Sequence, residues 1–479
     1  FVFGLFLMMI LYVRKVKGAV LISIIASTIL AVIVQAFAHI DRISETNPTG
    51  WGQTVPELKG SPIAVPVFDT LGKVDLFGGF GKLGIVSVIL LVFSLMLADF
   101  FDTMGTMVAV GAEGNLLDKE GNPPKTRQIL IVDSLAAVAG GVTALACPPD
   151  TDPPLDEPGL VEMLKYRAHN LGLAHLYPLG ALTVGLKGQA LTEMAELTAA
   201  GCVGFAQASQ PIQDTQVLLR AMQYAHSFGY TVWLNPVDPF LSRGGVMHAG
   251  PFASRLGLPG NPVTSETVAL HTICELVASV GCPVHLCRLS SAAGVELVRQ
   301  ARKAGLPITA DVAINHLHLT DVDVGFFDTA YRVEPPLRAQ RDRDALRAGL
   351  ADGTLDAICS DHTPVVEDAK RLPFGEAEPG AVGLSLLLPL SLKWGKEQGL
   401  NLVSVLDRLT RIPAGIAGID PARKNEPAGL SVGARADLCV FDPEESWVVN
   451  EKTLWGQCTD TPWLGREVQG RVRLTAVGG

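Results

Sequence analysis

The sequence predicts an α-helical membrane fragment followed by an α/β unit, because its physical character changes at residues 136–141. Before this point, Gly18–Ile40 runs for 23 residues without a formal charge, which is long enough to cross a bilayer. After it, short β-branched runs alternate with charged helical stretches, as in an α/β enzyme. The stretch at the change, AAVAGG, lacks the polar composition of a natural linker. We therefore interpret the chain as two partial proteins joined near residue 140.

The first predicted domain, residues 1–140, is expected to contain about three apolar spans. The chain opens inside an apolar run, Phe1–Val13, so we expect it to be truncated at its start. Basic residues follow at positions 14, 15 and 17, and the positive-inside rule places them on the cytoplasmic side. A later span, Leu83–Ala98, runs directly into Asp99 and Asp102. Carboxylates there either line a polar cavity, which indicates function, or mark the helix end at the membrane surface.

The second predicted domain, residues 141–425, repeats a strand followed by a helical stretch seven times. The strand candidates are Val142–Cys147, Tyr177–Thr183, Cys202–Phe205, Thr231–Leu234, Pro283–Cys287, Pro307–Val312 and Asp356–Ser360. Seven such units predict a parallel barrel that lacks one of the eight strands needed for closure, so its first and last strands should have open edges. In the third domain, residues 426–479, Leu430–Val449 alternates like antiparallel strands of a small accessory sheet.

Charge and cysteine usage limit the possible partners and compartment. Residues 1–140 hold 10 basic and 11 acidic side chains, and the remainder holds 28 and 37, a net charge of −9. This mild acidity argues against nucleic acid as a partner. All eight cysteines lie at or beyond Cys147 without a CxxC pair, which favours reduced thiols in a cytoplasmic domain over disulfides or zinc.

The segment FFDTMGTMVAVGAEGNLLDKEGNPP resembles the xanthine/uracil permease superfamily, in its guanine/hypoxanthine permease branch. The resemblance covers roughly residues 1–140 and implies that Asp102 and Thr103 fall on substrate-lining positions. It also implies a lipid bilayer as the partner and location of this part. The family needs a later helix with a substrate-binding Glu, and here the chain changes class before that helix. A transporter places its substrate between repeats, so we expect no transport by this fragment alone.

The second part carries several blocks whose order resembles the dihydroorotase branch of the amidohydrolase superfamily. The blocks are CPPDTDPPLDEPGLVEMLKYRA, GLKGQALTEMAELTAAGCVGF, NHLHLT, EPPLRAQRDRDALRAGLADGTLDAICSDHTP and GARADLCVFDP. They cover about residues 136–479. The resemblance implies an incomplete TIM-like (β/α) barrel of the amidohydrolase type with the remnant of a small β accessory domain. It also implies an active site at the carboxyl ends of the strands.

The chain departs from this family at the metal-binding positions. The family chemistry uses one or two divalent metals to polarise an amide and to generate hydroxide. The HxHxR motif of the first strand is absent, and Ala206–Ser209 replaces an Asp-bearing turn. Asn235 stands where a metal-binding His is expected, and Arg288 occupies another ligand position, where a fixed cation disfavours a metal. We therefore expect no metal cofactor, with zinc only if the enzyme is active.

One family position is retained and others are changed. Asp361 matches the metal ligand and general base, and His362 beside it is also retained, whereas a later family His is replaced by Val365. The substrate-binding Asn positions of the family are occupied by Asp150 and Glu334. Five of six ligand positions are thus changed while the barrel pattern stays intact. We expect Asp361 to pair with the arginine that replaces a ligand, so that the site is vestigial.

The other histidines are given structural roles. His316 and His318 would share one face of an extended segment as a possible metal pair, but without a third ligand we expect structural or family-retained roles. His226, His248 and His271 are isolated in the sequence, and we expect them at the surface or in helix packing.

The pattern resembles noncatalytic dihydroorotase homologues, which implies a structural subunit of aspartate transcarbamoylase in pyrimidine biosynthesis. An active, metal-dependent dihydroorotase and a purine transporter are the alternatives. Both parent families carry an AAVAGG-like stretch, so the junction is a plausible crossover point, whether in the gene itself or through artefactual assembly.

Overall fold

Seven short strands form one parallel sheet in the computed structural model, which describes residues 19–38, 55, 136–419, 430–456 and 458–479. The strands follow the sheet in chain order, β1-β2-β3-β4-β7-β8-β9, and each neighbouring pair is parallel. Their bounds are Ala144–Cys147 (β1), His175–Ala181 (β2), Gly204–Ala206 (β3), Val232–Leu234 (β4), Val284–Leu286 (β7), Ile308–Ala313 (β8) and Ala357–Cys359 (β9). All seven predicted strand positions are confirmed.

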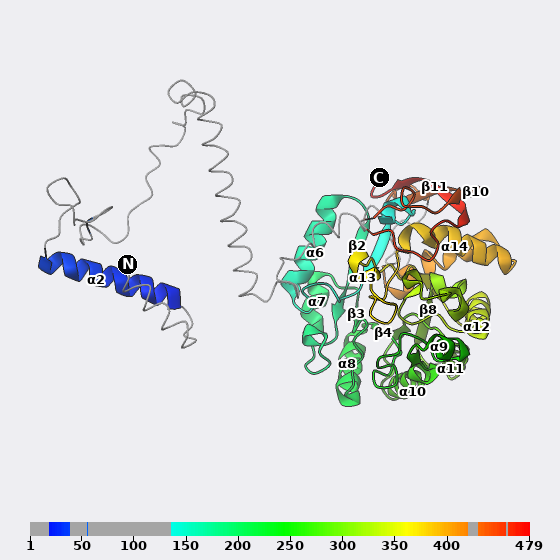
Figure 1. Cartoon of the computed structure of the whole chain (residues 1–479), viewed down its shortest axis with the longest axis horizontal. Helices are drawn as coiled ribbons and strands as arrows, with labels where there is room; N and C mark the ends of the chain where they lie inside the picture. The colour runs from blue at the N-terminus through cyan, green and yellow to red at the C-terminus, as the bar shows by residue number, and fades with distance from the viewer. Residues whose placement is uncertain (1–18, 39–54, 56–135, 420–429, 457) are drawn as a thin grey trace, which may run out of the picture. The chain divides into compact units, whose positions relative to one another are not determined.

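Within the described residues the sheet is open, as predicted, because β1 and β9 are its two ends and do not pair with each other. Helices surround the strands, which lie inside (Figure 1). The helices that follow successive strands are α6 (Pro158–Leu171), α7 (Met194–Ala200), α8 (Thr215–Phe228), α10 (Val263–Val280), α11 (Ala292–Lys303), α12 (Gln340–Ala351) and α14 (Leu384–Glu397). This curled parallel sheet with outer helices is an incomplete TIM-like barrel, as the sequence predicts.

Shorter elements complete the unit. They are β5 (Met247–His248), β6 (Gly260–Asn261), α9 (Pro251–Leu256), α13 (Glu367–Lys370), α15 (Leu402–Asp407), α16 (Arg411–Ile416), and the 3₁₀ helices Val184–Leu186, Ile314–Leu317, Asp321–Val324 and Thr329–Tyr331. Between sheet and helices lies one apolar core. Phe205 of β3, Leu286 of β7 and Met222 of α8 are among its largest fully buried side chains.

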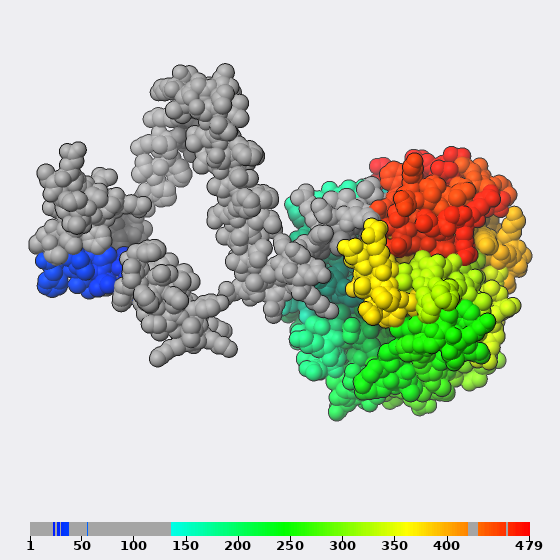
Figure 2. Space-filling model, viewed as in Figure 1, coloured from blue at the N-terminus to red at the C-terminus, as the bar shows by residue number. Residues whose placement is uncertain are grey.

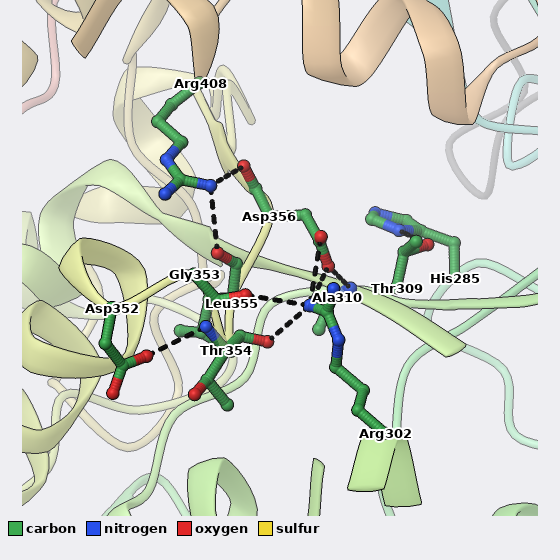
Figure 3. Close-up of polar contacts among 10 residues, drawn as sticks. All are labelled: His285, Arg302, Thr309, Ala310, Asp352, Gly353, Thr354, Leu355, Asp356 and Arg408. Carbon is green, nitrogen blue, oxygen red and sulfur yellow. Dashed lines mark hydrogen bonds and ion pairs between the residues drawn. The ribbon is translucent and has the colours of Figure 1, made fainter. Parts of the chain in front are cut away.

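Polar contacts fasten the amino ends of the last two strands (Figure 3). The Asp356 carboxylate, just before β9, pairs with Arg302 of α11 at 3.0 Å and accepts the Ala310 N–H of β8 at 2.8 Å. The Arg408 guanidinium donates to the carbonyls of Leu355 and Asp356 at 3.4 and 3.3 Å. In this fold the amino-terminal end of the barrel supports stability, whereas the chemistry lies at the opposite end.

The accessory sheet has two antiparallel strands among the described residues, β10 (Leu438–Val448) and β11 (Glu467–Ala476). The sequence analysis placed its alternating pattern at Leu430–Val449, and the structure forms one strand there. The partner of that strand comes from the end of the chain. Lys396 of α14 donates to Gln469 at 3.1 Å, and Figure 2 shows the C-terminal strands lying against this helix.

The stretch AAVAGG, residues 136–141, packs against the barrel. Ala136 and Ala137 are fully buried beside Leu384, and Thr475 donates to the Val138 carbonyl at 2.6 Å. A Cβ at Gly140 would overlap the Leu384 carbonyl. The small side chains therefore allow a close approach to the start of α14. The predicted domain boundary at residue 140 stays a prediction.

The predicted membrane fragment is not supported. Within Gly18–Ile40 the structure forms α2 (Ala19–Ala38), in which hydroxyl and amide side chains such as Ser23 and Gln35 interrupt the apolar residues. In the described part of the chain, no helix is long and apolar enough to span a membrane. The other predicted spans, with Asp102 and Thr103, lie outside the described residues.

Candidate active site

Strained backbone marks the carboxyl ends of four strands. Leu186, Ala208, Arg288 and Asp361 have φ values of 56°, 50°, 56° and 45°, in the left-handed region that non-glycine residues rarely adopt. They follow β2, β3, β7 and β9, respectively. Such strain persists only where the surroundings impose it, and it clusters at active sites and ligand-binding positions. The backbone therefore indicates a functional site at this end of the sheet.

Arg288 is the centre of this site. Its Nη1 donates to Asp361 Oδ1 at 3.0 Å and to the Glu334 carbonyl at 3.2 Å, and its Nη2 donates to Ser209 Oγ at 3.0 Å. Its Nε lies 3.4 Å from Asn235 Oδ1. One guanidinium thus joins residues that follow β3, β4 and β9 with the loop before α12. The predicted pair of Arg288 with Asp361 is confirmed.

The pair is largely shielded from water, with 18% of the Arg288 side chain and 9% of the Asp361 side chain exposed. Burial by itself lowers the pKa of Arg288, but the charges of Asp361 and Cys359 and the hydrogen bond to Asp361 outweigh it. The net result is a pKa above the ordinary arginine value. Arg288 is therefore a permanent cation.

The residues at the strand ends do not fit the divalent metal of the family. The guanidinium donates to Asp361 Oδ1 and places a fixed positive charge beside the carboxylate. The Asn235 amide is engaged on both sides, because its Nδ2 donates to the Ala208 carbonyl at 3.1 Å while its oxygen faces Arg288. A metal here would have to displace a half-buried cation that already satisfies the carboxylate.

The other predicted site residues lie around this pair or apart from it. Glu334 contributes its carbonyl to Arg288, while its carboxylate lies 3.6 Å from Arg332. His362 accepts the Gly383 N–H at Nδ1, at 3.0 Å. Asp150 lines a separate open cleft of about 640 Å³ together with Lys187. The structure thus brings four of the predicted residues together: Asn235, Arg288, Asp361 and Glu334.

Of the two histidines of the NHLHLT segment, His316 is buried and His318 is half-buried. Burial lowers the pKa of His316 to about 4 and that of His318 to about 3, so both rings are neutral at pH 7. His318 Nε2 lies 2.9 Å from the Leu390 carbonyl. The charge of Asp361 acts in the opposite direction to burial and raises the pKa of His316, but burial outweighs it. They do not form a metal pair with each other in this arrangement, since His318 turns to α14.

Sequence reasoning missed two features of this region. One is Ser209, which accepts a hydrogen bond from Arg288; its position shortly after strand β3 is the signal that could have indicated it. The second feature is a group of His285, Cys287 and Asp311 whose potential ligand atoms all lie within 4.8 Å of one another. The strand pairing that brings Cys287 level with Asp311 is not visible in a single sequence.

Comparison with known proteins identifies relatives of this fold. A protein-family model described as "Dihydro-orotase-like" matches residues 120–293. A dihydroorotase-like protein of Pseudomonas putida is 43% identical over 349 residues, which is 72% of this chain and 80% of the relative. A dihydroorotase of Geobacter sp. (strain M21) is 36% identical, over 74% of this chain and 82% of the relative. Among solved structures, the L-hydantoinase (dihydropyrimidinase) of Arthrobacter aurescens aligns with a TM-score of 0.64 and 25% identity, over 73% of this chain and 79% of that one.

Proposed function

This chain belongs to the dihydroorotase-like family of amidohydrolases, and we propose that it is a noncatalytic member that serves as a structural subunit. The partner we propose is the catalytic subunit of aspartate transcarbamoylase, in the cytoplasm, as part of pyrimidine biosynthesis. The family follows from the relatives, whereas the loss of catalysis and the partner are our proposal.

One observation carries this proposal, the ion pair of Arg288 with Asp361. Ring closure or hydrolysis of a cyclic amide in this family needs a metal-bound hydroxide and a carboxylate able to accept a proton. Here the one retained carboxylate is paired with a half-buried guanidinium at 3.0 Å. Asn235 is a neutral amide at a second ligand position, and it too faces Arg288. The groups that would act on substrate bind one another instead.

The preserved fold supports a role as a scaffold. Seven strands, their helices and a continuous core are retained while the ligand positions have changed. Without selection on the chain, substitutions would accumulate in the core as readily as at the site. Large-to-small core substitutions commonly lower the free energy of unfolding by about 2–5 kcal/mol. Retention of the core therefore points to selection for a folded surface.

The proposal is tested on the full-length chain in two assays. We expect no cyclisation of carbamoyl-aspartate above background, with or without added zinc. We also expect a stable complex with the aspartate transcarbamoylase catalytic chain in size-exclusion chromatography with light scattering. Cyclisation that disappears in Asp361→Ala would refute the noncatalytic role. Absence of a complex at micromolar concentrations of both chains would refute the proposed partner.

An active dihydroorotase is the second candidate, favoured by the retained Asp361 and by relatives such as the Geobacter dihydroorotase at 36% identity. The variant Asn235→His/Arg288→His restores two imidazoles and separates the two proposals. We expect this variant to remain inactive, because the HxHxR motif is also absent from the sequence. Activity in the unaltered chain would favour the second candidate.

The permease-like part remains a prediction from sequence. The resemblance that implies a purine-transport origin, a fusion and contact with a lipid bilayer rests on residues around Asp102 and Thr103, which lie outside the described residues. Flotation of the full-length chain with liposomes tests the bilayer contact, and amplification across codons 120–160 of the source DNA tests the fusion.

A further inference from the structure

A group of potential metal ligands lies on the neighbouring strands β7 and β8, beside the backbone of Arg288. His285 belongs to β7, Cys287 follows that strand directly, and Asp311 belongs to the neighbouring strand β8. One ligand atom from each residue lies within 4.8 Å of the others. His285 and Asp311 are 1% and 5% exposed. The group uses none of the side chains that form the vestigial site.

The imidazole of His285 is held in an orientation suited to a metal ligand. Its Nδ1 lies 2.8 Å from Thr309 Oγ1, and its Nε2 lies 3.0 Å from Asp311 Oδ2. Figure 3 shows His285 beside Thr309. The Trp233 ring packs on the imidazole with 4.4 Å between centroids. Metal-binding histidines usually have their second ring nitrogen hydrogen-bonded in this way, which fixes the ring and the tautomer.

The carboxylate and the thiol have capacity left for a ligand. Asp311 Oδ1 accepts the Arg288 backbone N–H at 2.7 Å, which fixes the carboxylate and leaves Oδ2 directed toward His285. The Cys287 thiol makes one long contact, 4.0 Å to the His285 carbonyl. A sulfur, a nitrogen and a carboxylate oxygen therefore converge on one position.

We propose that His285 Nε2, Cys287 Sγ and Asp311 Oδ2 bind one Zn²⁺ ion as a buried structural site, which ties β7 to β8. Zinc prefers this donor set in tetrahedral geometry, with Zn–N and Zn–O bonds of about 2.0–2.2 Å and a Zn–S bond of about 2.3 Å. Tetrahedral bonds of that length separate N from O by about 3.3 Å, so the 3.0 Å pair needs to open by only a few tenths of an ångström.

The charges and protons of this site balance. On binding, the Cys287 thiol loses its proton to solvent. The ring proton of His285, which faces the Asp311 carboxylate at Nε2 in the metal-free site, moves to Nδ1; Nε2 then coordinates the ion and the Nδ1–H donates to Thr309. The thiolate and the carboxylate neutralise the two charges of the ion. A water molecule completes the coordination. The inference goes beyond the proposed function, because it adds a metal without adding catalysis.

The test is a Co²⁺ titration of the full-length chain after removal of metals with a chelator. Co²⁺ takes the place of Zn²⁺, and a bound thiolate produces a sulfur-to-cobalt charge-transfer band. We expect one equivalent to bind with this band, and Zn²⁺ to abolish it by displacement. Cys287→Ser should lose the band. Two controls should keep it: Cys282→Ser, which changes a buried cysteine just before β7, and Asp361→Asn. Thr309→Val should weaken binding about 10- to 100-fold.

Two results would overturn the site: no charge-transfer band in the unaltered chain, or a band of equal strength in Cys287→Ser. Loss of the band in Asp361→Asn would also overturn it, because the ion would then lie at the vestigial site. Circular dichroism of each metal-free variant checks that it is folded. The outcome is separate from the proposed function, which is tested by cyclisation and by complex formation.

Discussion

Removal of the Arg288 guanidinium should strongly destabilise the barrel. In Arg288→Met the aliphatic stem and the strained backbone remain, but Asp361 loses its 3.0 Å partner while 91% of its side chain stays shielded. Breaking a fully buried ion pair by removing one partner costs about 3–5 kcal/mol, because the other charge is left uncompensated. This pair is half-buried, but the variant also loses the bonds to Ser209 and to the Glu334 carbonyl, so we expect a cost near the lower end of that range.

The assay is urea unfolding of the full-length chain, followed by tryptophan fluorescence. Arg299→Met is the matched control, because Arg299 pairs with Glu296 and Asp352 at the surface, where such pairs contribute about 0.2–1 kcal/mol. Arg288→Met/Asp361→Leu should recover part of the loss, since neither charge is then left alone. If Arg288→Met costs no more than Arg299→Met, the guanidinium does not organise the strand ends and our interpretation of the site is wrong.

Two further predictions concern stability. Gly140→Ala places a Cβ against the Leu384 carbonyl and should lower the free energy of urea unfolding by about 1–3 kcal/mol. Gly159→Ala, which has open space around its Cβ, should be neutral or stabilising. Equal effects of the two substitutions would contradict the close packing of AAVAGG. Burial holds the pKa of His318 at about 3, below the unfolded value near 6.5, so its contribution to stability is present above pH 6.5 and is lost as the pH falls toward 3. Its slope is at most about 1.4 kcal/mol per pH unit, and His318→Gln should flatten the pH profile in this window, while the exposed His226→Gln should not.

The sequence predicted the strands well because each is a short apolar run bounded by polar or turn residues. The order of seven strand–helix units then fixed the parallel topology and the open edges, which the structure confirms. The partner of β10 was missed because β11, Glu467–Ala476, carries Gln, Gly, Arg and Thr among its apolar residues and lacks a clear alternation.

The part of the candidate site that could be predicted is the ion pair, because residue types alone indicate that opposite charges attract. A fixed cation near a retained carboxylate predicts an ion pair, and Arg288 and Asp361 form it. The additional acceptors, Ser209 Oγ and the Glu334 carbonyl, depend on loop conformations that residue types do not specify. The convergence of Cys287 on Asp311 depends on the register of β7 with β8, which a single sequence does not specify.

The geometry around Arg288 explains how a barrel can lose a metal and keep the shape of its active-site end. In the family chemistry a divalent ion connects ligands from several strands, so its loss removes a cross-link as well as a catalyst. A guanidinium has five donors in a fixed plane and can make equivalent connections with one positive charge. Here it joins residues after β3, β4 and β9, and its backbone N–H, held at a φ of 56°, binds Asp311. The surroundings therefore impose the strained backbone of Arg288, because both its side chain and its main-chain N–H bind groups at the ends of other strands. Under the proposed noncatalytic role, a guanidinium that replaces the connections made by a metal need not expose the barrel to unfolding, so the proposed loss of catalysis is compatible with a stable structural subunit.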